Sequence, residues 1–141
     1  MTEQELNRVR ELKKRIHDVE SRLQSLQTAA ENLVPILDGL PHSNEAKSRV
    51  EKITLSLVET EHELDNLRGQ LILTKTELAE KILREVEDAT YQTLLVLRYV
   101  ECLSFKETAR RMHFTLRHIF RLHDKILENV ICLHIAAQNI S

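Results

Sequence analysis

A repeat of apolar residues, alternately three and four positions apart, runs without a break through four heptads near the start of the chain. This period places the apolar side chains in a narrow stripe along an α-helix, and such a stripe must be covered by a partner helix. Thr2 and Glu5 have the spacing of a capping box. We therefore predict a helix over about residues 3–37, on the order of 50 Å long. The stripe consists of Val9, Leu12, Ile16, Val19, Leu23, Leu26, Ala30, Leu33 and Leu37.

A second repeat with the same spacing follows a short connection. Pro35 is expected to kink or end the first helix, and the segment from Asp38 to Pro41 is typical of a helix stop. Ser43 or Asn44 can cap the second helix. Because the connection is short, we predict an antiparallel coiled-coil hairpin within one chain, with pairing between chains, and hence a homo-oligomer, as the competing arrangement. The second stripe consists of Val50, Ile53, Leu57, Thr60, Leu64, Leu67, Leu71, Thr74 and Leu78.

Composition favours helices throughout the chain. Only 2 of the 141 residues are Gly and 2 are Pro, whereas sheets joined by tight turns need more of both. Leu, Glu, Arg, Lys and Gln are abundant, and all are good helix formers. We therefore predict an all-α fold. Gly69 lies inside the second predicted helix at a cost of about 1 kcal/mol relative to Ala, and we interpret it as a point where two helices approach closely.

The heptad pattern stops near Glu85, and a different pattern follows. Asp88 or Thr90 can cap a new helix. Residues 94–100 are apolar on most sides, which is typical of a helix buried in a compact core. We therefore place a boundary at 85, with a helical hairpin over residues 1–85 and a small helix-turn-helix bundle over residues 86–141.

The C-terminal unit carries the pattern of a helix-turn-helix. Ser104 and Glu107 form a second capping box and predict a short helix over residues 105–112. Ala109 is small, as the close crossing of two helices in this motif requires. The inward positions of this helix are predicted to be Phe105, Thr108, Ala109 and Met112.

A turn and a third helix complete the motif. His113 and Phe114 form the predicted turn, with the Phe114 ring as an apolar plug. Thr115 caps the next helix. The inward face of that helix is predicted to hold Ile119, Leu122, Ile126 and Val130, which leaves Leu116, Arg117, His118, Phe120, Arg121, His123 and Lys125 for the outside or its borders.

Positive charge is concentrated in this motif. Residues 104–125 contain six Lys or Arg and two acidic residues, whereas residues 1–83 contain 12 basic and 15 acidic residues. A basic segment on an otherwise near-neutral chain indicates nucleic-acid binding. Arg117 and Arg121 are four apart and share a helical face, from which they can reach guanine edges. Lys106, Arg110 and Arg111 lie on the preceding helix, where phosphate contacts are expected.

Residues 94–130 resemble region four of bacterial sigma factors, and they resemble still more the small phage and prophage transcriptional regulators of the ArpU/RinA type. That resemblance implies that Thr115, Arg117, His118 and Arg121 face DNA, with Leu116 standing where a polar residue is usual and altering base preference. It also implies a phage origin and contact with RNA polymerase. The residues that carry the resemblance are Leu97, Arg98, Tyr99, Ser104, Glu107, Ala109, Met112, Thr115, Arg117, His118, Arg121, Leu122 and His123.

Two positions depart from the pattern of those regulators. Leu103 precedes the short helix and His113 follows it, at places where such proteins usually have Gly. A non-Gly residue at a positive-φ turn is tolerated at some cost. We therefore expect a positive φ at these two positions.

Other chemistry finds little support in the sequence. His118 and His123 are five apart, off a common face, and no Cys or carboxylate cluster joins them, so no metal site is predicted. Near phosphate, both would make binding pH-dependent. The chain has no glycine-rich phosphate loop, nucleophile elbow or HExxH motif. We therefore predict no enzyme activity and no cofactor.

The sequence also bears on the compartment. No apolar run reaches the about 18 residues that a membrane span needs, and the polar N-terminal segment is unlike a signal peptide. Cys102 and Cys132 form no CxxC pair and are expected to be reduced thiols. We therefore expect a cytoplasmic, nucleoid-associated protein of a bacterial host, without membrane contact.

These features predict a sequence-specific transcriptional regulator that binds double-stranded DNA with the helix over residues 115–128. Two alternatives stay open. A small terminase subunit of a DNA-packaging machine also joins a helix-turn-helix to coiled-coil helices. A protein-binding coiled-coil adaptor would have no DNA affinity, and its C-terminal bundle would be structural.

Overall fold

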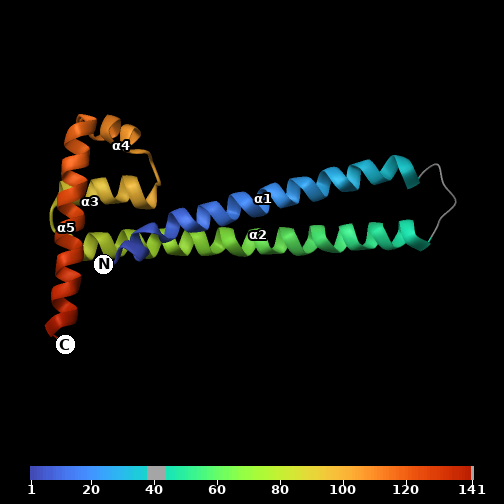
Figure 1. Cartoon of the computed structure of the whole chain (residues 1–141), viewed down its shortest axis with the longest axis horizontal. Helices are drawn as coiled ribbons and strands as arrows, with labels where there is room; N and C mark the ends of the chain where they lie inside the picture. The colour runs from blue at the N-terminus through green and yellow to red at the C-terminus, as the bar shows by residue number, and fades with distance from the viewer. Residues whose placement is uncertain (38–43, 141) are drawn as a thin grey trace. The chain divides into compact units, whose positions relative to one another are not determined.

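The computed structural model describes residues 1–37 and 44–140, and every regular element in these ranges is helical. The chain is therefore all-α, as predicted. The hairpin stop at 38–41 and the Ser43 cap lie outside the described residues. Within the described ranges, no helix has the length and apolar character needed to cross a membrane. The elements are α1 (Glu3–Leu37), α2 (Asn44–Glu85), α3 (Ala89–Leu95), the π-helical segment η1 (Val96–Val100), α4 (Phe105–Met112) and α5 (Leu116–Ile140) (Figure 1).

Packing divides the chain into two compact units. One is Leu12–Gln70, and the other joins Met1–Glu11 to Leu71–Ser141. The sequence pattern had placed a boundary at 85, where α2 does end. The contacts instead place the start of α1 and the last turns of α2 with the C-terminal helices, because their apolar side chains pack into the same core.

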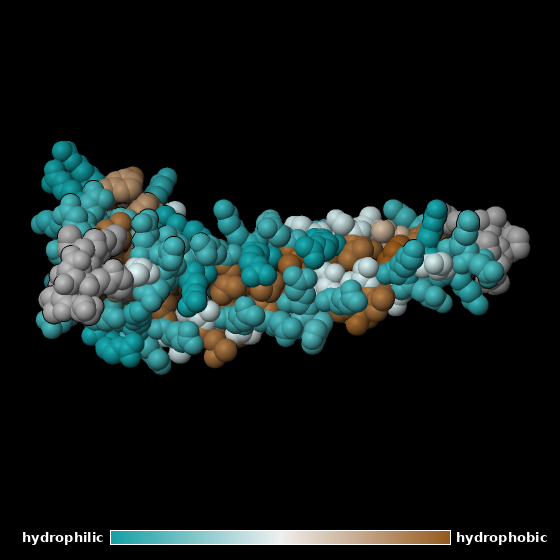
Figure 2. Space-filling view, turned by 60° about the horizontal axis from the view of Figure 1, so that its bottom comes forward, coloured by the Kyte–Doolittle hydropathy of each residue, from teal (hydrophilic) through white to brown (hydrophobic). Residues whose placement is uncertain are grey.

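In the unit Leu12–Gln70, segments of α1 and α2 run side by side in opposite directions (Figure 1). Arg22 bonds Glu63 at 3.3 Å and Arg68 bonds Glu20 at 3.2 Å, so ion pairs tie the two segments within one chain. Apolar side chains gather between hydrophilic ones along the long helices (Figure 2). That this pairing is a supercoiled coiled coil stays a prediction. The most deeply buried residues of its stripes are Ile16, Val19, Thr60, Leu64 and Leu67.

Thr60 is a polar residue in this apolar stripe. Its side chain is buried, and its hydroxyl donates to the Ser56 carbonyl oxygen at 2.6 Å. A buried hydroxyl without a partner would be costly. The bond to the preceding turn satisfies it locally, so threonine is tolerated in the stripe without a partner from the other helix.

Gly69 does not mark a close helix approach, and that prediction was wrong. A Cβ atom built on Gly69 would meet nothing within 4 Å. The position is exposed on α2. The effect of this glycine is therefore only the conformational cost of placing Gly in the middle of a long helix.

Replacement of Gly69 by Ala is expected to raise the free energy of unfolding by up to about 1 kcal/mol, because it restores helix propensity without a clash. Urea denaturation followed by circular dichroism measures the change. Ser48→Gly, at another exposed position of α2, is the matched control and should lower stability. An unchanged or reduced stability of Gly69→Ala would contradict the open environment described for this site.

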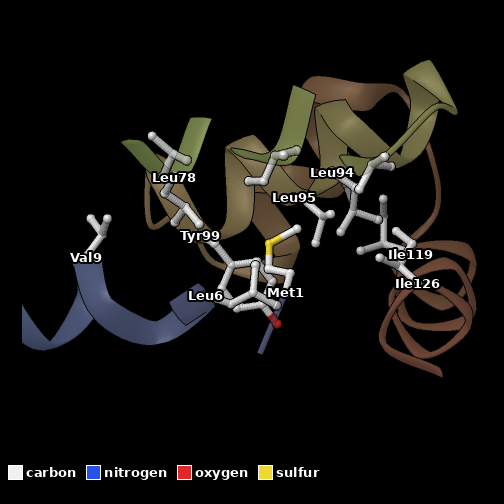
Figure 3. Packing of buried hydrophobic residues seen from close by; sticks show 13 residues of the cluster. Met1, Leu6, Val9, Leu78, Leu94, Leu95, Tyr99, Ile119 and Ile126 are labelled. Carbon is white, nitrogen blue, oxygen red and sulfur yellow. The ribbon is translucent and has the colours of Figure 1, made fainter. Parts of the chain in front are cut away.

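The second unit has one continuous apolar core (Figure 3). Leu94 and Leu95 are fully buried, which confirms that residues 94–100 are covered on most sides. The first turns of α1 and the last turns of α2 supply four of its thirteen residues, and Met1 and Val86, which flank these helices, add two more. The core residues are Met1, Leu6, Val9, Leu78, Ile82, Val86, Leu94, Leu95, Tyr99, Val100, Ala109, Ile119 and Ile126.

The corner between α2 and α3 is fixed by side-chain caps. Asp88, and not Thr90, is the N-cap of α3, and its carboxylate accepts from the Thr90 and Tyr91 amides at 2.8 and 3.1 Å. Gln92 donates from Nε2 to the carbonyl oxygens of Leu83 and Val86 at the end of α2. These bonds satisfy backbone groups that helix ends leave without partners.

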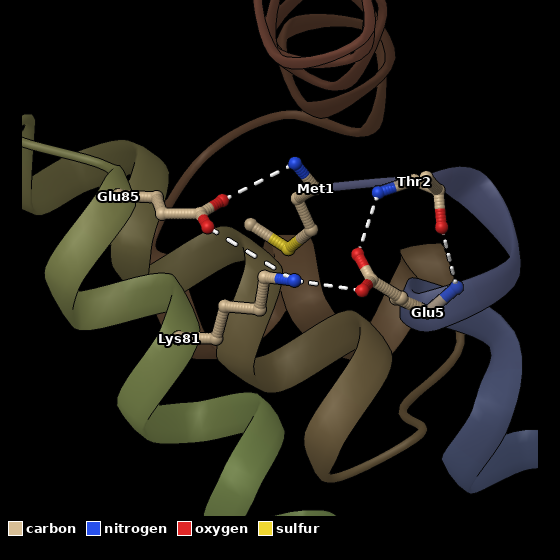
Figure 4. Close-up of polar contacts among 5 residues, drawn as sticks. All are labelled: Met1, Thr2, Glu5, Lys81 and Glu85. Carbon is tan, nitrogen blue, oxygen red and sulfur yellow. Dashed lines mark hydrogen bonds and ion pairs between the residues drawn. The ribbon is translucent and has the colours of Figure 1, made fainter. Parts of the chain in front are cut away.

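The predicted capping box at the start of α1 is formed. The Thr2 amide donates to Glu5 Oε2 at 2.8 Å, and the Glu5 amide donates to Thr2 Oγ1 at 3.2 Å. Lys81 of α2 donates to Glu5 Oε1 at 2.7 Å, and the Met1 amino group pairs with Glu85 at 3.2 Å (Figure 4). The start of α1 is thereby held on the end of α2 by charge as well as by apolar packing.

Glu5 makes this contact sensitive to acid. The hydrogen bond from Lys81, with help from the Thr2 amide, lowers the pKa of Glu5 from 4.5 to about 2. A depressed carboxylate pKa gives stability that is present above the unfolded pKa and is lost as pH falls toward the folded one. Relative to Glu5→Gln, the wild type is therefore expected to be more stable near neutral pH, and the difference should shrink between 4.5 and about 2. Urea denaturation at several pH values measures this, and a constant difference across that window would contradict it.

Candidate nucleic-acid interface

The start of α4 follows the sequence closely. Ser104 is extended, and its hydroxyl accepts from the Glu107 amide at 3.2 Å, which confirms the N-cap. In place of the second bond of the predicted capping box, the Glu107 carboxylate bonds Arg110 at 2.7 Å and lies 3.7 Å from Arg111. One acidic side chain thus orients and partly neutralises both arginines of α4.

The turn after α4 depends on a left-handed residue. His113 has φ 59° and ψ 36°. Its amide donates to the Arg110 carbonyl oxygen at 3.3 Å, and the Phe114 amide donates to that of Ala109 at 3.0 Å. This pair of bonds is the Schellman motif, in which Gly is usual. The expected positive φ at His113 is confirmed.

The loop before α4 differs from the expectation. The positive φ lies at Cys102 (56°), one residue before Leu103. Arg98 supports this loop, since its Nη1 donates to the Leu103 carbonyl oxygen at 2.7 Å. The Arg98 guanidinium also lies 4.1 Å from the centre of the Phe105 ring. Burial lowers the pKa of Arg98, and the carbonyl and the aromatic face partly replace the lost water.

The third helix begins as predicted. Thr115 Oγ1 accepts from the His118 amide at 3.2 Å, which confirms the cap of α5. Ile119 and Ile126 are fully buried, and Leu122 packs against the same core. The side chain of Val130 lies outside the described residues. The predicted inward phase of the helix is therefore right over the described part.

The inward positions of α4 are also as predicted. Thr108 and Ala109 are buried, and Phe105 and Met112 pack against the core. The Thr108 hydroxyl donates to the Ser104 carbonyl oxygen at 2.8 Å, so its burial leaves no polar atom without a partner. The two helices of the motif are joined by a defined turn and share one core.

Phe114 is not the apolar plug that the sequence suggested. Its side chain is 37% exposed, and its ring makes an edge contact with the His118 ring at 4.9 Å. The left-handed turn directs Phe114 toward the first turn of α5 instead of the core. The prediction was wrong because the sequence pattern does not specify which way a residue after such a turn points.

All nine predicted DNA-binding residues are exposed. Arg117 and Arg121 stand two residues before and two residues after the buried Ile119. Two residues turn an α-helix by about 200°, so both arginines lie on the side of α5 opposite Ile119. Among the described residues, the ion pairs of this group are those of Glu107 with Arg110 and Arg111. The nine residues are Lys106, Arg110, Arg111, Thr115, Leu116, Arg117, His118, Arg121 and Lys125.

Both arginines of α5 lie in its first two turns. Helical geometry places Asp124 and Glu128 on the same face as Arg117 and Arg121, one and two turns further along. The positive end of the helix dipole is also at the beginning. On this face an anionic partner is therefore attracted to the first two turns, and Asp124 and Glu128 oppose its approach further along.

His123 lies at the border between the outer and inner faces of α5. It is half-buried, its Nε2 is hydrogen-bonded to the Tyr99 hydroxyl, and Phe105 meets its ring edge-on at 4.9 Å. Burial lowers the pKa of His123 and raises that of Tyr99, while Asp124 opposes the shift of His123 and Arg98 adds to it. This histidine therefore joins α5 to η1, and its titration against phosphate stays a prediction.

No protein-family model, curated protein or solved structure matches the chain. The resemblance to phage regulators therefore rests on the residues of the C-terminal segment alone. In the described ranges, no group of three or more His, Cys, Asp or Glu side chains is placed to hold a metal ion.

Substitution of Ile119 by Asp is expected to unfold the C-terminal unit, because it buries a charge without a partner in a fully covered position. Leu116→Asp, one turn away and 41% exposed, is the matched control and should leave the melting curve nearly unchanged. Thermal denaturation followed by circular dichroism compares them. Equal effects of the two substitutions would contradict the orientation of α5.

Proposed function

We propose that the chain is a sequence-specific regulator of transcription that binds double-stranded DNA through α4 and α5. The observation that carries this proposal is the position of Arg117 and Arg121. Both are exposed on the first turns of a capped helix whose opposite side is anchored in the core by Ile119. Helix-turn-helix proteins present their second helix to the major groove in this way.

In this proposal α4 and α5 make different contacts with DNA. The first two turns of α5 enter the major groove, where Arg117 and Arg121 bond guanine edges or flanking phosphates. Lys106, Arg110 and Arg111 of α4 contact phosphates and set the register. Glu107 limits the net charge of α4, and so favours oriented contacts over diffuse attraction.

Regulation, rather than packaging or scaffolding, is the favoured role of this binding. The resemblance to phage regulators supports promoter binding with contact to RNA polymerase, in the bacterial cytoplasm and on its nucleoid. Arg22–Glu63 and Arg68–Glu20 pair α1 with α2 inside one chain, which leaves outer faces of the helices for a homo-oligomer. A dimer would place two copies of α5 about one DNA turn apart, or a multiple of it.

Alanine substitution of Arg117 and Arg121 together is expected to weaken specific binding by at least about tenfold, because each base contact contributes about 1–3 kcal/mol. The measurement is selection of bound fragments from sheared genomic DNA of the source organism at two salt concentrations. The wild type should enrich a defined site, and the double variant should not. A site at a promoter favours regulation, and a site at a packaging origin favours the terminase alternative.

The matched control removes the same charge elsewhere. Arg15 and Arg49 are exposed in the unit Leu12–Gln70, and their double alanine variant should enrich the same site as the wild type. Equal losses in both double variants would indicate only non-specific phosphate attraction. Absence of enrichment by the wild type would overturn the proposal and favour the adaptor alternative.

A further inference from the structure

Three large apolar side chains are exposed on the proposed interface. Phe114, Leu116 and Phe120 are 37%, 41% and 45% exposed, on or beside the same turns that carry the arginines. Apolar groups of this size are unfavourable in water and commonly mark a binding surface when they cluster. Their place among cations, rather than on a neutral face, limits the partner to one that is anionic and also offers apolar groups.

Leu116 and Phe120 form a stripe of their own. They are four residues apart, so they lie on one side of α5, one turn from each other. Arg117 and Arg121 follow each of them by one residue and form a parallel stripe about 100° further round the helix. The first two turns of α5 therefore present an apolar row beside a basic row.

The Phe120 side chain is held by aromatic packing. Phe120 packs on the Phe105 ring at 5.0 Å, and Phe105 lies under the Arg98 guanidinium at 4.1 Å. Leu116 is the first residue of α5, directly after the Thr115 cap. Little conformational freedom is lost when a packed side chain such as that of Phe120 meets a partner, which favours a specific contact over a loose one.

We infer that Leu116 and Phe120 recognise thymine through its 5-methyl group, an inference that rests on the proposed function. The thymine methyl is the apolar group that the major groove displays, and aliphatic and aromatic side chains contact it. The anionic backbone on either side of the groove suits the adjacent arginines. The two residues are separated by about 6 Å along the helix axis. Successive base pairs are about 3.4 Å apart, so the two side chains reach neighbouring or next-but-one base pairs.

The experiment removes the methyl group and nothing else. The full chain first selects its site from random duplexes, and each thymine of that site is then replaced in turn by deoxyuridine, which keeps every hydrogen bond. Dissociation constants are measured by fluorescence anisotropy for the wild type, Leu116→Ala and Phe120→Ala, with Arg117→Ala as the control. Each ratio compares two duplexes with one protein preparation, so partial unfolding of a variant cancels.

For the wild type, loss of the methyl at one or two positions should weaken binding about fourfold, the factor expected for one buried methyl group. Leu116→Ala should abolish the effect at one position and Phe120→Ala at the other. Arg117→Ala should bind all duplexes more weakly and keep the wild-type ratio. Specific binding that is indifferent to every methyl, or ratios unchanged in both apolar variants, would overturn this inference alone. A wild type that selects no site would overturn the proposed function and this inference with it.

Discussion

The core shared by the first turns of α1, the last turns of α2 and the C-terminal helices is the constraint on which the candidate interface depends. A short helical segment such as residues 86–129 has a small core of its own, and the fraction of surface that a domain buries falls with its size. Leu6 and Val9 from α1, and Leu78 and Ile82 from α2, complete its core. The orientation of α5 is therefore fixed through Ile119 and Ile126 by residues that are far away in the sequence. The Glu5–Lys81 and Met1–Glu85 pairs add charge contacts at the rim of that core.

Polar contacts then set the position of the interface on the core. Arg98 bonds the backbone of Leu103 and lies over Phe105, so it holds the loop from which α4 begins. Its Nε atom is buried without a hydrogen-bond partner among the described residues, and the cation–π contact partly compensates that cost. The Tyr99–His123 hydrogen bond joins η1 to the second turn of α5. Both arrangements hold the elements that carry the exposed side chains of the proposed interface.

Local rules predicted much of this structure. The bounds of α1 and α4, the caps at Thr2, Ser104 and Thr115, and the burial of Ile119 follow from spacing and capping chemistry, which act over one or two turns. The errors lie where distant packing decides. A heptad repeat identifies the buried face of a helix but not the element that covers it. The packing of the start of α1 and the end of α2 into the C-terminal core was therefore not predicted. The close approach at Gly69 was inferred from composition, and the space around it is open.

In the candidate site, too, local patterns predict some features and tertiary packing decides others. Exposure of the basic residues follows from the helical phase, which the caps and Ile119 establish. The side-chain directions of Phe114 and His123 depend instead on a left-handed turn and on a tyrosine 24 residues earlier. His123 has a half-buried position with a hydrogen-bond partner, and its charge is disfavoured there. A histidine in an exposed basic segment and a histidine that joins two helices have the same sequence signature, so only the tertiary contacts distinguish them.

The interface combines two kinds of interaction with different consequences for recognition. Charge attraction from the arginines and lysines is long in range, insensitive to sequence and screened by salt. Apolar contact is short in range and depends on the presence of a methyl group at one position. A surface with cations alone would hold any duplex, and a surface with apolar groups alone would not attract one. The adjacent rows on the first turns of α5 supply both, and the acidic residues Asp124 and Glu128 end the basic row where the helix leaves the proposed groove.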